Sequence, residues 1–203
     1  MPAADTRHMI LEATRDCVLA DGYAALSTRK VAELAGVPLS QIHYHFGSKE
    51  KLVLALLEAE NERLIARQAA LYAGDEPLSV QWDRACDYLD QDLKSGYVRI
   101  LNELIAAGYS RPELAARLNV LLGEWIKVLT SAFAYRLDRG LDLGPFTAPQ
   151  LAALAGNVFL GAEQSILLGH ENDAHPIRGA LRAVGTLIAD AERRAGLTPA
   201  PTG

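Results

Sequence analysis

The spacing of hydrophobic residues along the chain is that of α-helices almost throughout. Apolar side chains recur at three- and four-residue steps, as Ile10, Ala13 and Cys17 do in the first segment, and no stretch shows the alternation of a β-strand. Glycines and helix-capping residues separate the segments. The pattern predicts an all-α fold with helices at about 6–21, 28–35, 38–47, 49–72, 76–94, 97–108, 112–138, 148–169 and 177–195.

Composition excludes several classes of protein. The 203 residues contain no run of about 18 apolar residues, and the first residues lack the pattern of a signal peptide, so we expect a soluble cytoplasmic protein without a membrane segment. Cys17 and Cys86 lie far apart and are expected to be small core residues. The 25 acidic and 20 basic residues give a net charge of −5, which argues against indiscriminate binding to nucleic acid.

The third short helix concentrates polar and aromatic residues in the stretch "LSQIHYHF". His43 and His45 stand two residues apart, so on a helix they point about 200° away from each other, and one metal ion cannot readily take both. The chain has no phosphate-binding glycine loop, no Gly-x-Ser-x-Gly elbow and no His-Glu-x-x-His pair. We therefore predict no catalytic residues, no metal and no cofactor, and hence no enzyme.

Two short helices joined by a tight turn are typical of a helix-turn-helix, whose second helix enters the major groove of DNA. Gln41 can pair with an adenine edge, Ser40 can donate or accept a hydrogen bond, and Leu39 can contact a thymine methyl group. Ile42 and Phe46, four residues apart, are predicted to anchor the helix to the core. His43, Tyr44, His45 and Lys49 can reach phosphates or sugars, although a packed helix with an ordinary polar surface stays an alternative.

The segment "GYAALSTRKVAELAGVPLSQIHYHFGSKEKLVLALL" resembles the DNA-binding domain of TetR-family transcriptional regulators, and the resemblance spans about residues 8–57. It implies a three-helix DNA-binding domain in residues 1–50. A long helix then leads into a helical ligand-binding and dimerisation domain in residues 51–203, whose tail from about 197 is expected to be disordered. It further implies a homodimer that binds a palindromic operator and releases it on binding a small molecule.

By this resemblance, the residues expected to approach DNA are Thr28, Arg29, Leu39, Ser40, Gln41, His43, Tyr44, His45 and Lys49. The chain departs from the family at Leu39, Ser40 and His43, where lysine, glycine and tyrosine are common, and its recognition helix carries no Lys or Arg. Through residue 51 it has six basic and six acidic residues, so we expect modest non-specific affinity, with some dependence on histidine protonation. A helical sensor or protein-interaction module without operator binding is the alternative function.

The resemblance also implies an effector pocket among the middle helices and a dimer interface at the end of the chain. The candidate residues for lining the effector pocket are aromatic or polar residues on apolar helix faces, although each is also suited to a protein core. Such a lining favours a small and mostly apolar effector. The candidates are Trp82, Asn102, Tyr109, Trp125, Phe159, Glu163 and Gln164. The last two helices are rich in Ala, Gly and Leu, which predicts either a four-helix interface with a second subunit or close packing within one.

Overall fold

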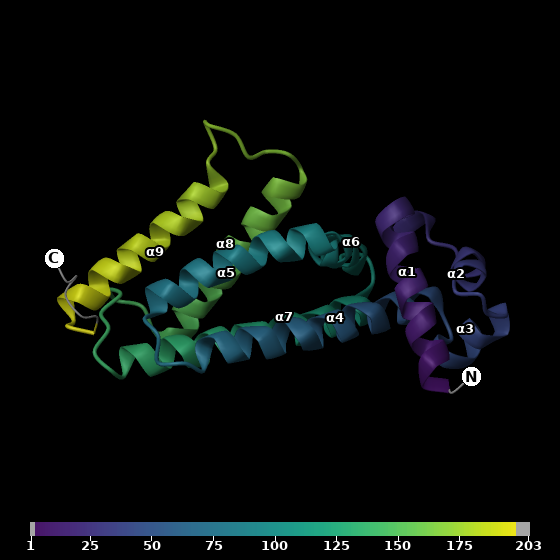
Figure 1. Cartoon of the computed structure of the whole chain (residues 1–203), viewed down its shortest axis with the longest axis horizontal. Helices are drawn as coiled ribbons and strands as arrows, with labels where there is room; N and C mark the ends of the chain where they lie inside the picture. Colours follow the sequence, from purple (N-terminus) through teal and green to yellow (C-terminus); the bar gives the residue numbers. More distant parts are fainter. Residues whose placement is uncertain (1–2, 198–203) are drawn as a thin grey trace. The chain divides into compact units, whose positions relative to one another are not determined.

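The computed structural model describes residues 3–197, which form nine α-helices and no strand (Figure 1). One isolated backbone bridge, between Asn172 and His175, closes the last inter-helix loop. The all-α prediction is confirmed, while the tail predicted to be disordered lies, from residue 198, outside the described residues. The helices are α1 (Ala3–Ala25), α2 (Thr28–Leu34), α3 (Leu39–Phe46), α4 (Lys49–Tyr72), α5 (Leu78–Ser95), α6 (Tyr97–Gly108), α7 (Pro112–Leu137), α8 (Ala148–Leu167) and α9 (Ile177–Arg194).

Gly22 is the position at which the backbone of α1 departs from helical geometry. The sequence predicts that this helix ends at Gly22, and the backbone of Gly22 leaves helical geometry there, with φ 81° and ψ 163°. A last turn then continues to Ala25, so the structure has a kink followed by a short extension. This φ lies in a region that residues with a Cβ rarely adopt, which explains why glycine stands at the kink.

The chain divides into two compact units. The N-terminal unit contains the residues up to Arg63 together with Gly96–Leu118, and the C-terminal unit contains Leu64–Ser95 together with the chain from Asn119 onward. The helices α4 and α7 each contribute residues to both units. The predicted division at residue 50 concerns function and stays a prediction.

The core of the N-terminal unit stabilises two short helices, α2 and α3, that have little stability of their own. In this unit α1 packs against α2 and α6, and α2 packs against α3. Ile10, Val18 and Val31 are completely buried, and Cys17 lies among them with 1 % of its surface exposed. An isolated helix of seven or eight residues is marginal in water, so burial of these side chains supplies the stability of α2 and α3.

The core of the C-terminal unit forms where α5 packs along α9 and both contact α8. Trp82 of α5 is buried and donates a hydrogen bond from Nε1 to the carbonyl of Leu181, at 2.8 Å. Gly185 of α9 lies opposite: a Cβ there would come within 3.2 Å of the Trp82 ring. Cys86 is buried in the same core, so both cysteines are core residues, as predicted. Within the described part of the chain, no helix combines the length and apolar content needed to cross a bilayer.

The turn between α4 and α5 is closed by buried polar side chains. Arg136 of α7 donates from Nη2 to the carbonyls of Gly74 and Glu76, at 3.0 and 2.6 Å. Gln81 donates from Nε2 to the carbonyls of Leu71 and Gly74, at 3.0 and 3.1 Å. These bonds satisfy carbonyls that the end of α4 leaves without helical partners, and they hold that end of α4 in place.

A buried glutamate of α9 caps the start of α5. The Oε1 atom of Glu192 accepts a hydrogen bond from the backbone N–H of Leu78 at 2.5 Å, and Oε2 accepts one from the Ser79 hydroxyl at 2.6 Å. The residue is 2 % exposed. A carboxylate at a helix N-terminus satisfies orphan N–H groups and interacts favourably with the helix dipole. Glu192 therefore joins the last turns of α9 to the start of α5 within the C-terminal unit.

Replacing Glu192 with alanine should lower the free energy of unfolding by about 2–4 kcal/mol, because the change leaves buried donors unsatisfied. Urea titration measures the change. Ser79→Ala is the matched control, since it removes one of the bonds and keeps the carboxylate, and it should cost only about 1 kcal/mol. Equal losses in the two variants would contradict the capping role of Glu192.

Candidate functional site

The helices α2 and α3 form a helix-turn-helix. Gly36 in the turn has φ 65°, a left-handed conformation that glycine adopts without strain. The N–H of Val37 donates to the carbonyl of Ala32 at 3.0 Å and closes the turn. The short turn and the contact between α2 and α3 fix the direction in which α3 leaves the core.

The two sides of α3 differ sharply in exposure. Ile42 and Phe46 are buried, with 1 % and 7 % of their surfaces exposed, so the predicted anchoring pair is confirmed. Tyr44 on the other side is 80 % exposed. The other predicted DNA-binding residues of α3 lie on this side or at its margins: Ser40 and His43 are exposed, and Leu39, Gln41 and His45 are half-buried. The structure therefore brings polar and aromatic side chains together on one accessible face.

The predicted residues outside α3 are Thr28, Arg29 and Lys49. Thr28 opens α2 and is half-buried, and Arg29 follows it as an exposed side chain. Lys49 opens α4, but its ammonium group is directed to the end of α1. Its Nζ donates to the carbonyl of Ala24 at 3.0 Å and lies 4.9 Å from the centre of the Tyr23 ring. A contact between Lys49 and a DNA phosphate stays a prediction, and it would have to compete with this interaction.

Tyr23 lies at the centre of a polar cluster that the sequence analysis missed. Its N–H, displaced from helical bonding by the kink at Gly22, donates to the carboxylate of Glu103 in α6. Its hydroxyl accepts a hydrogen bond from Arg111 at 2.7 Å, and Arg111 also pairs with Glu50 at 3.0 Å. Helical periodicity carries no signal for partners about 80 residues apart. This cluster, which is entirely within the N-terminal unit, ties α6 and the start of α7 to the beginning of α4.

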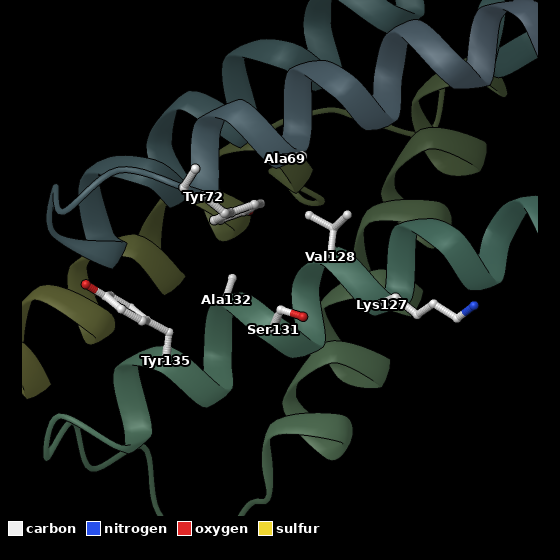
Figure 2. Close-up of a pocket in the computed structure, with 8 residues that line it drawn as sticks. Ala69, Tyr72, Lys127, Val128, Ser131, Ala132 and Tyr135 are labelled. Carbon is white, nitrogen blue, oxygen red and sulfur yellow. The ribbon is translucent and has the colours of Figure 1, made fainter.

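A groove in the C-terminal unit lies between the second half of α4 and α7, with a volume of about 440 Å³ (Figure 2). Tyr72 of α4 and Val128 and Ala132 of α7 point into the space between the two helices, whereas Lys127 points away. The Tyr135 hydroxyl at one end donates to Asp75 at 2.6 Å. Burial raises the pKa of the Tyr72 phenol, so this group stays neutral at physiological pH. The groove is lined by Ala69, Tyr72, Ala73, Lys127, Val128, Ser131, Ala132 and Tyr135.

A family model described as "Bacterial regulatory proteins, tetR family" matches residues 10–56, the segment that contains this helix-turn-helix. Residues 10–56 of the chain are thus similar to the DNA-binding segment of TetR-family regulators. The resemblance inferred from the sequence is thus confirmed, and the family consists of transcriptional regulators rather than enzymes.

Curated relatives agree with this match of the N-terminal segment. The repressor AcnR of Corynebacterium efficiens is 38 % identical over 30 % of this chain and 32 % of its own length. The regulator UidR of Escherichia coli strain K12 is 27 % identical over 57 % of this chain and 58 % of its own. The chain thus spans between about a third and three fifths of these curated TetR-family regulators. The crystal structure of the regulator FadR from Bacillus subtilis shares the fold, with a TM-score of 0.74 and 15 % identity over 91 % of this chain and 98 % of FadR.

The residues predicted to bind a TetR-family effector are scattered over both units. Asn102 and Tyr109 belong to the N-terminal unit: Asn102 bonds the carbonyl of Val98 at 2.9 Å, and Tyr109 is largely exposed. Trp82, Phe159, Trp125, Glu163 and Gln164 belong to the C-terminal unit. None of the seven lines the groove of Figure 2, so their role in ligand binding stays a prediction.

Three of these residues form one aromatic cluster. The Phe159 ring lies 5.3 Å from Trp82 and 6.4 Å from Trp125, centre to centre. Trp82 and Phe159 are buried and serve the core, whereas Trp125 is half-buried. Gln164 is exposed on α8. The sequence analysis missed the groove residues Tyr72, Ser131 and Tyr135, because polar residues at helical spacing also suit a solvated surface. Only the groove between α4 and α7 distinguishes them from surface residues.

Glu163 has the most unusual environment of the predicted ligand residues. Its Oε2 atom is buried and has no hydrogen-bond partner among the described residues. Burial, with a smaller contribution from the nearby negative charge of Asp92, raises its pKa from 4.5 to about 8. At neutral pH the side chain is therefore mostly a protonated, uncharged acid.

This environment predicts a pH dependence of stability. Between about pH 4.5 and pH 8 the folded chain holds a proton on Glu163 that the unfolded chain has released, so the free energy of unfolding falls as pH rises and levels off above pH 8. Glu163→Gln, which copies the neutral acid, should remove this decline and stabilise the protein at pH 8.5 by about 2–4 kcal/mol. Urea titration across this pH range measures the effect.

Asp138→Asn is the matched control, because it removes an exposed acid that follows α7 in the same unit. This variant should keep the wild-type slope of stability against pH. If Glu163→Gln kept that slope too, the proposed protonation of Glu163 in the folded state would be wrong.

Proposed function

We propose that the chain is a homodimeric transcriptional repressor that binds a palindromic operator and releases it when a small, mostly apolar molecule binds the C-terminal unit. The observation that supports this function best is the asymmetry of α3. Ile42 and Phe46 hold one side in the core, and the polar and aromatic side, including Tyr44, is accessible. A recognition helix needs this arrangement to enter a major groove without losing its packing.

Uncharged side chains of α3 are the ones suited to contact base edges. Gln41 can make paired hydrogen bonds to an adenine edge, Ser40 can donate or accept, and Leu39 can contact a thymine methyl group. The exposed His43 and Tyr44 suit contacts to phosphates or sugars, and His45 at the margin can join them. Because α3 has no Lys or Arg, sequence preference rests on hydrogen bonding and shape rather than on charge.

Attraction to the phosphate backbone has few contributors. Arg29 is exposed near the start of α2, and Lys51 is exposed in α4. Lys30, however, pairs with Asp21 at 2.5 Å, and Lys49 bonds Ala24. Non-specific affinity should accordingly be modest and its salt dependence shallow. The same engaged cations favour the second candidate function, a helical sensor or interaction module without operator binding.

Dimerisation through α8 and α9 is supported by their outer surfaces. Leu154 and Val158 of α8 are 50 % and 47 % exposed, and Leu187 of α9 is 66 % exposed. Gly161 lies in the exposed part of α8, where an added Cβ would meet nothing within 4 Å in the single chain. Apolar side chains in this number are a liability on a monomer, and a four-helix interface between two copies buries them. A two-fold dimer also matches a palindromic operator, whose half-sites lie about 34–36 Å apart.

Effector release requires a link between the two units, and α4 is suited to provide it. This helix begins at Lys49 beside the helix-turn-helix and ends at Tyr72, which lines the groove of Figure 2. A ligand that prefers the conformation with low DNA affinity weakens operator binding by its differential affinity for the two states. FadR of Bacillus subtilis was crystallised with stearoyl-CoA, so this fold accommodates a ligand with a long apolar chain. That precedent supports an apolar effector here.

Selection of DNA fragments from a random pool should enrich a palindrome, which the second candidate function does not predict. Against that palindrome, Gln41→Ala should lose about 1–3 kcal/mol of binding free energy and leave affinity for random DNA unchanged, because it removes contacts to one base pair. Lys49→Ala is the contrasting variant and should weaken all sequences alike. Equal losses on operator and random DNA for Gln41→Ala would exclude base readout by this residue.

A charge introduced into α8 tests the interface. Gly161→Glu should raise the dissociation constant of the dimer at least about 100-fold, equivalent to about 2.7 kcal/mol, because the interface would bury an unpaired carboxylate. Sedimentation at micromolar concentration measures it. Gly123→Glu in α7 is the matched control: there too a Cβ meets nothing within 4 Å, and this variant should stay dimeric. A dimeric Gly161→Glu that binds the full palindrome normally would refute the assignment.

A further inference from the structure

Glu163 is a half-buried acid of the C-terminal unit whose Oε2 atom is buried, and it differs from Glu192 in its hydrogen bonding. Glu192 is 2 % exposed, and its carboxylate has three donors around it, from Leu78 and Ser79. The Oε2 atom of Glu163 has no partner among the described residues. A buried polar atom without a partner is costly, and a leucine or methionine at this position would avoid the cost. An acid held in such a place is therefore a candidate for binding a group that is not part of the chain.

The charges around Glu163 indicate which group that is. Asp92 of α5 is the acid that acts on Glu163, and Asp92 already has a cation. The Nη2 atom of Arg67 lies 2.5 Å from its carboxylate, and the Arg67 guanidinium stacks over the Tyr88 ring at 4.1 Å from the ring centre. Arg67 is thus held by Asp92 and Tyr88 and neutralises that acid. Glu163 is left as the acid without a counter-ion.

Aromatic rings lie next to this acid along the same helix. Phe159 precedes Glu163 by one turn of α8, so both side chains project from one side of the helix. The Trp125 ring lies edge-on to Phe159, with the ring centres 6.4 Å apart, and Trp125 is half-buried. Aromatic rings favour apolar bodies and attract cations through their faces. A carboxyl group beside such rings matches an apolar molecule that carries one positive charge.

We propose that Glu163 binds the ammonium group of an effector that is an apolar amine, with the apolar body of the amine packed on Phe159 and Trp125. The inference rests on the proposed effector response of this chain and names the chemical class of the effector. On binding, the Glu163 carboxylic acid gives up its proton to solvent, and the resulting carboxylate accepts hydrogen bonds from the ammonium. Acidic effectors are disfavoured, because an anion would repel the carboxylate that forms when Glu163 loses its proton.

The proton that leaves Glu163 makes binding depend on pH. The charged groups concerned are Glu163 on α8, Asp92 on α5 and Arg67 on α4, and only Glu163 changes charge. With a pKa of about 8, the acid must be deprotonated at a cost of about tenfold in affinity at pH 7. Amine affinity should therefore rise about tenfold from pH 7 to pH 9, where a primary alkyl amine is still mostly protonated. Affinity for a neutral analogue should not change.

Calorimetry with two probes of matched shape tests the proposal: 4-phenylbutylamine and the neutral 4-phenylbutan-1-ol. The amine should bind the wild-type dimer at least tenfold more tightly than the alcohol at pH 8. At pH 7, binding of the amine should release close to one proton, whereas binding of the alcohol should release none. The number of protons is obtained by comparing the binding enthalpy in buffers that differ in their enthalpy of ionisation. Glu163→Gln should bind both probes equally, without proton release.

Asp138→Asn is the matched control, since it removes one exposed acid from the same unit and should retain the tenfold preference and the proton release. Equal affinity of the wild type for both probes, no binding of either, or an unchanged preference in Glu163→Gln would overturn the proposal. Operator release is measured separately. If the amine binds with proton release but leaves the operator bound, the ligand class stands and the proposed effector response is wrong. If another compound releases the operator and the amine shows no preference, the response stands and the ligand class is wrong.

Discussion

The helix-turn-helix of this protein depends on the burial of two side chains in a helix too short to be stable alone. The helix α3 runs only from Leu39 to Phe46, and an isolated helix of that length does not persist in water. Ile42 and Phe46 pack it against the core, and the contact of α3 with α2 sets its direction. The exposed face that carries Ser40, His43 and Tyr44 exists because the opposite face is anchored.

The kink at Gly22 has consequences beyond α1. It frees the N–H of Tyr23, which bonds Glu103, and it places the Tyr23 ring where Lys49 and Arg111 gather. Residues from α1, α4, α6 and the start of α7 thereby meet in one polar cluster within the N-terminal unit. Lys49, which is predicted to approach DNA, is thus also part of the cluster that supports the helix-turn-helix. If Lys49 binds a DNA phosphate, it must leave its contacts in this cluster, so DNA affinity is expected to depend on the conformation of the cluster.

Three acids in the interior of the C-terminal unit, Glu192, Asp92 and Glu163, differ in whether the chain provides partners for them. Glu192 has all of its capping partners, and Asp92 has Arg67, so both are satisfied within the chain. The Oε2 atom of Glu163 is buried without a hydrogen-bond partner among the described residues. Burial raises its pKa while Asp92 adds to the effect, whereas the hydrogen bond to Arg67 opposes the same desolvation at Asp92. Similar residue types therefore have different roles, and the presence of a partner distinguishes them.

The sequence by itself determined the local features of this protein. Helical periodicity and the glycines predicted all nine helices of the described chain to within a few residues. The periodicity also identified Ile42 and Phe46 as the side chains that anchor α3. Both features depend on neighbours three or four positions away in the sequence. The motif around α2 and α3 was enough to recognise the family for the same reason. The tertiary structure alone decided which distant groups meet: Tyr23 with Glu103, Glu192 with the start of α5, and α4 with α7 around the groove. Periodicity shows which face of a helix is apolar, but it cannot show which other helix covers that face, and the partners of buried polar groups follow from that packing.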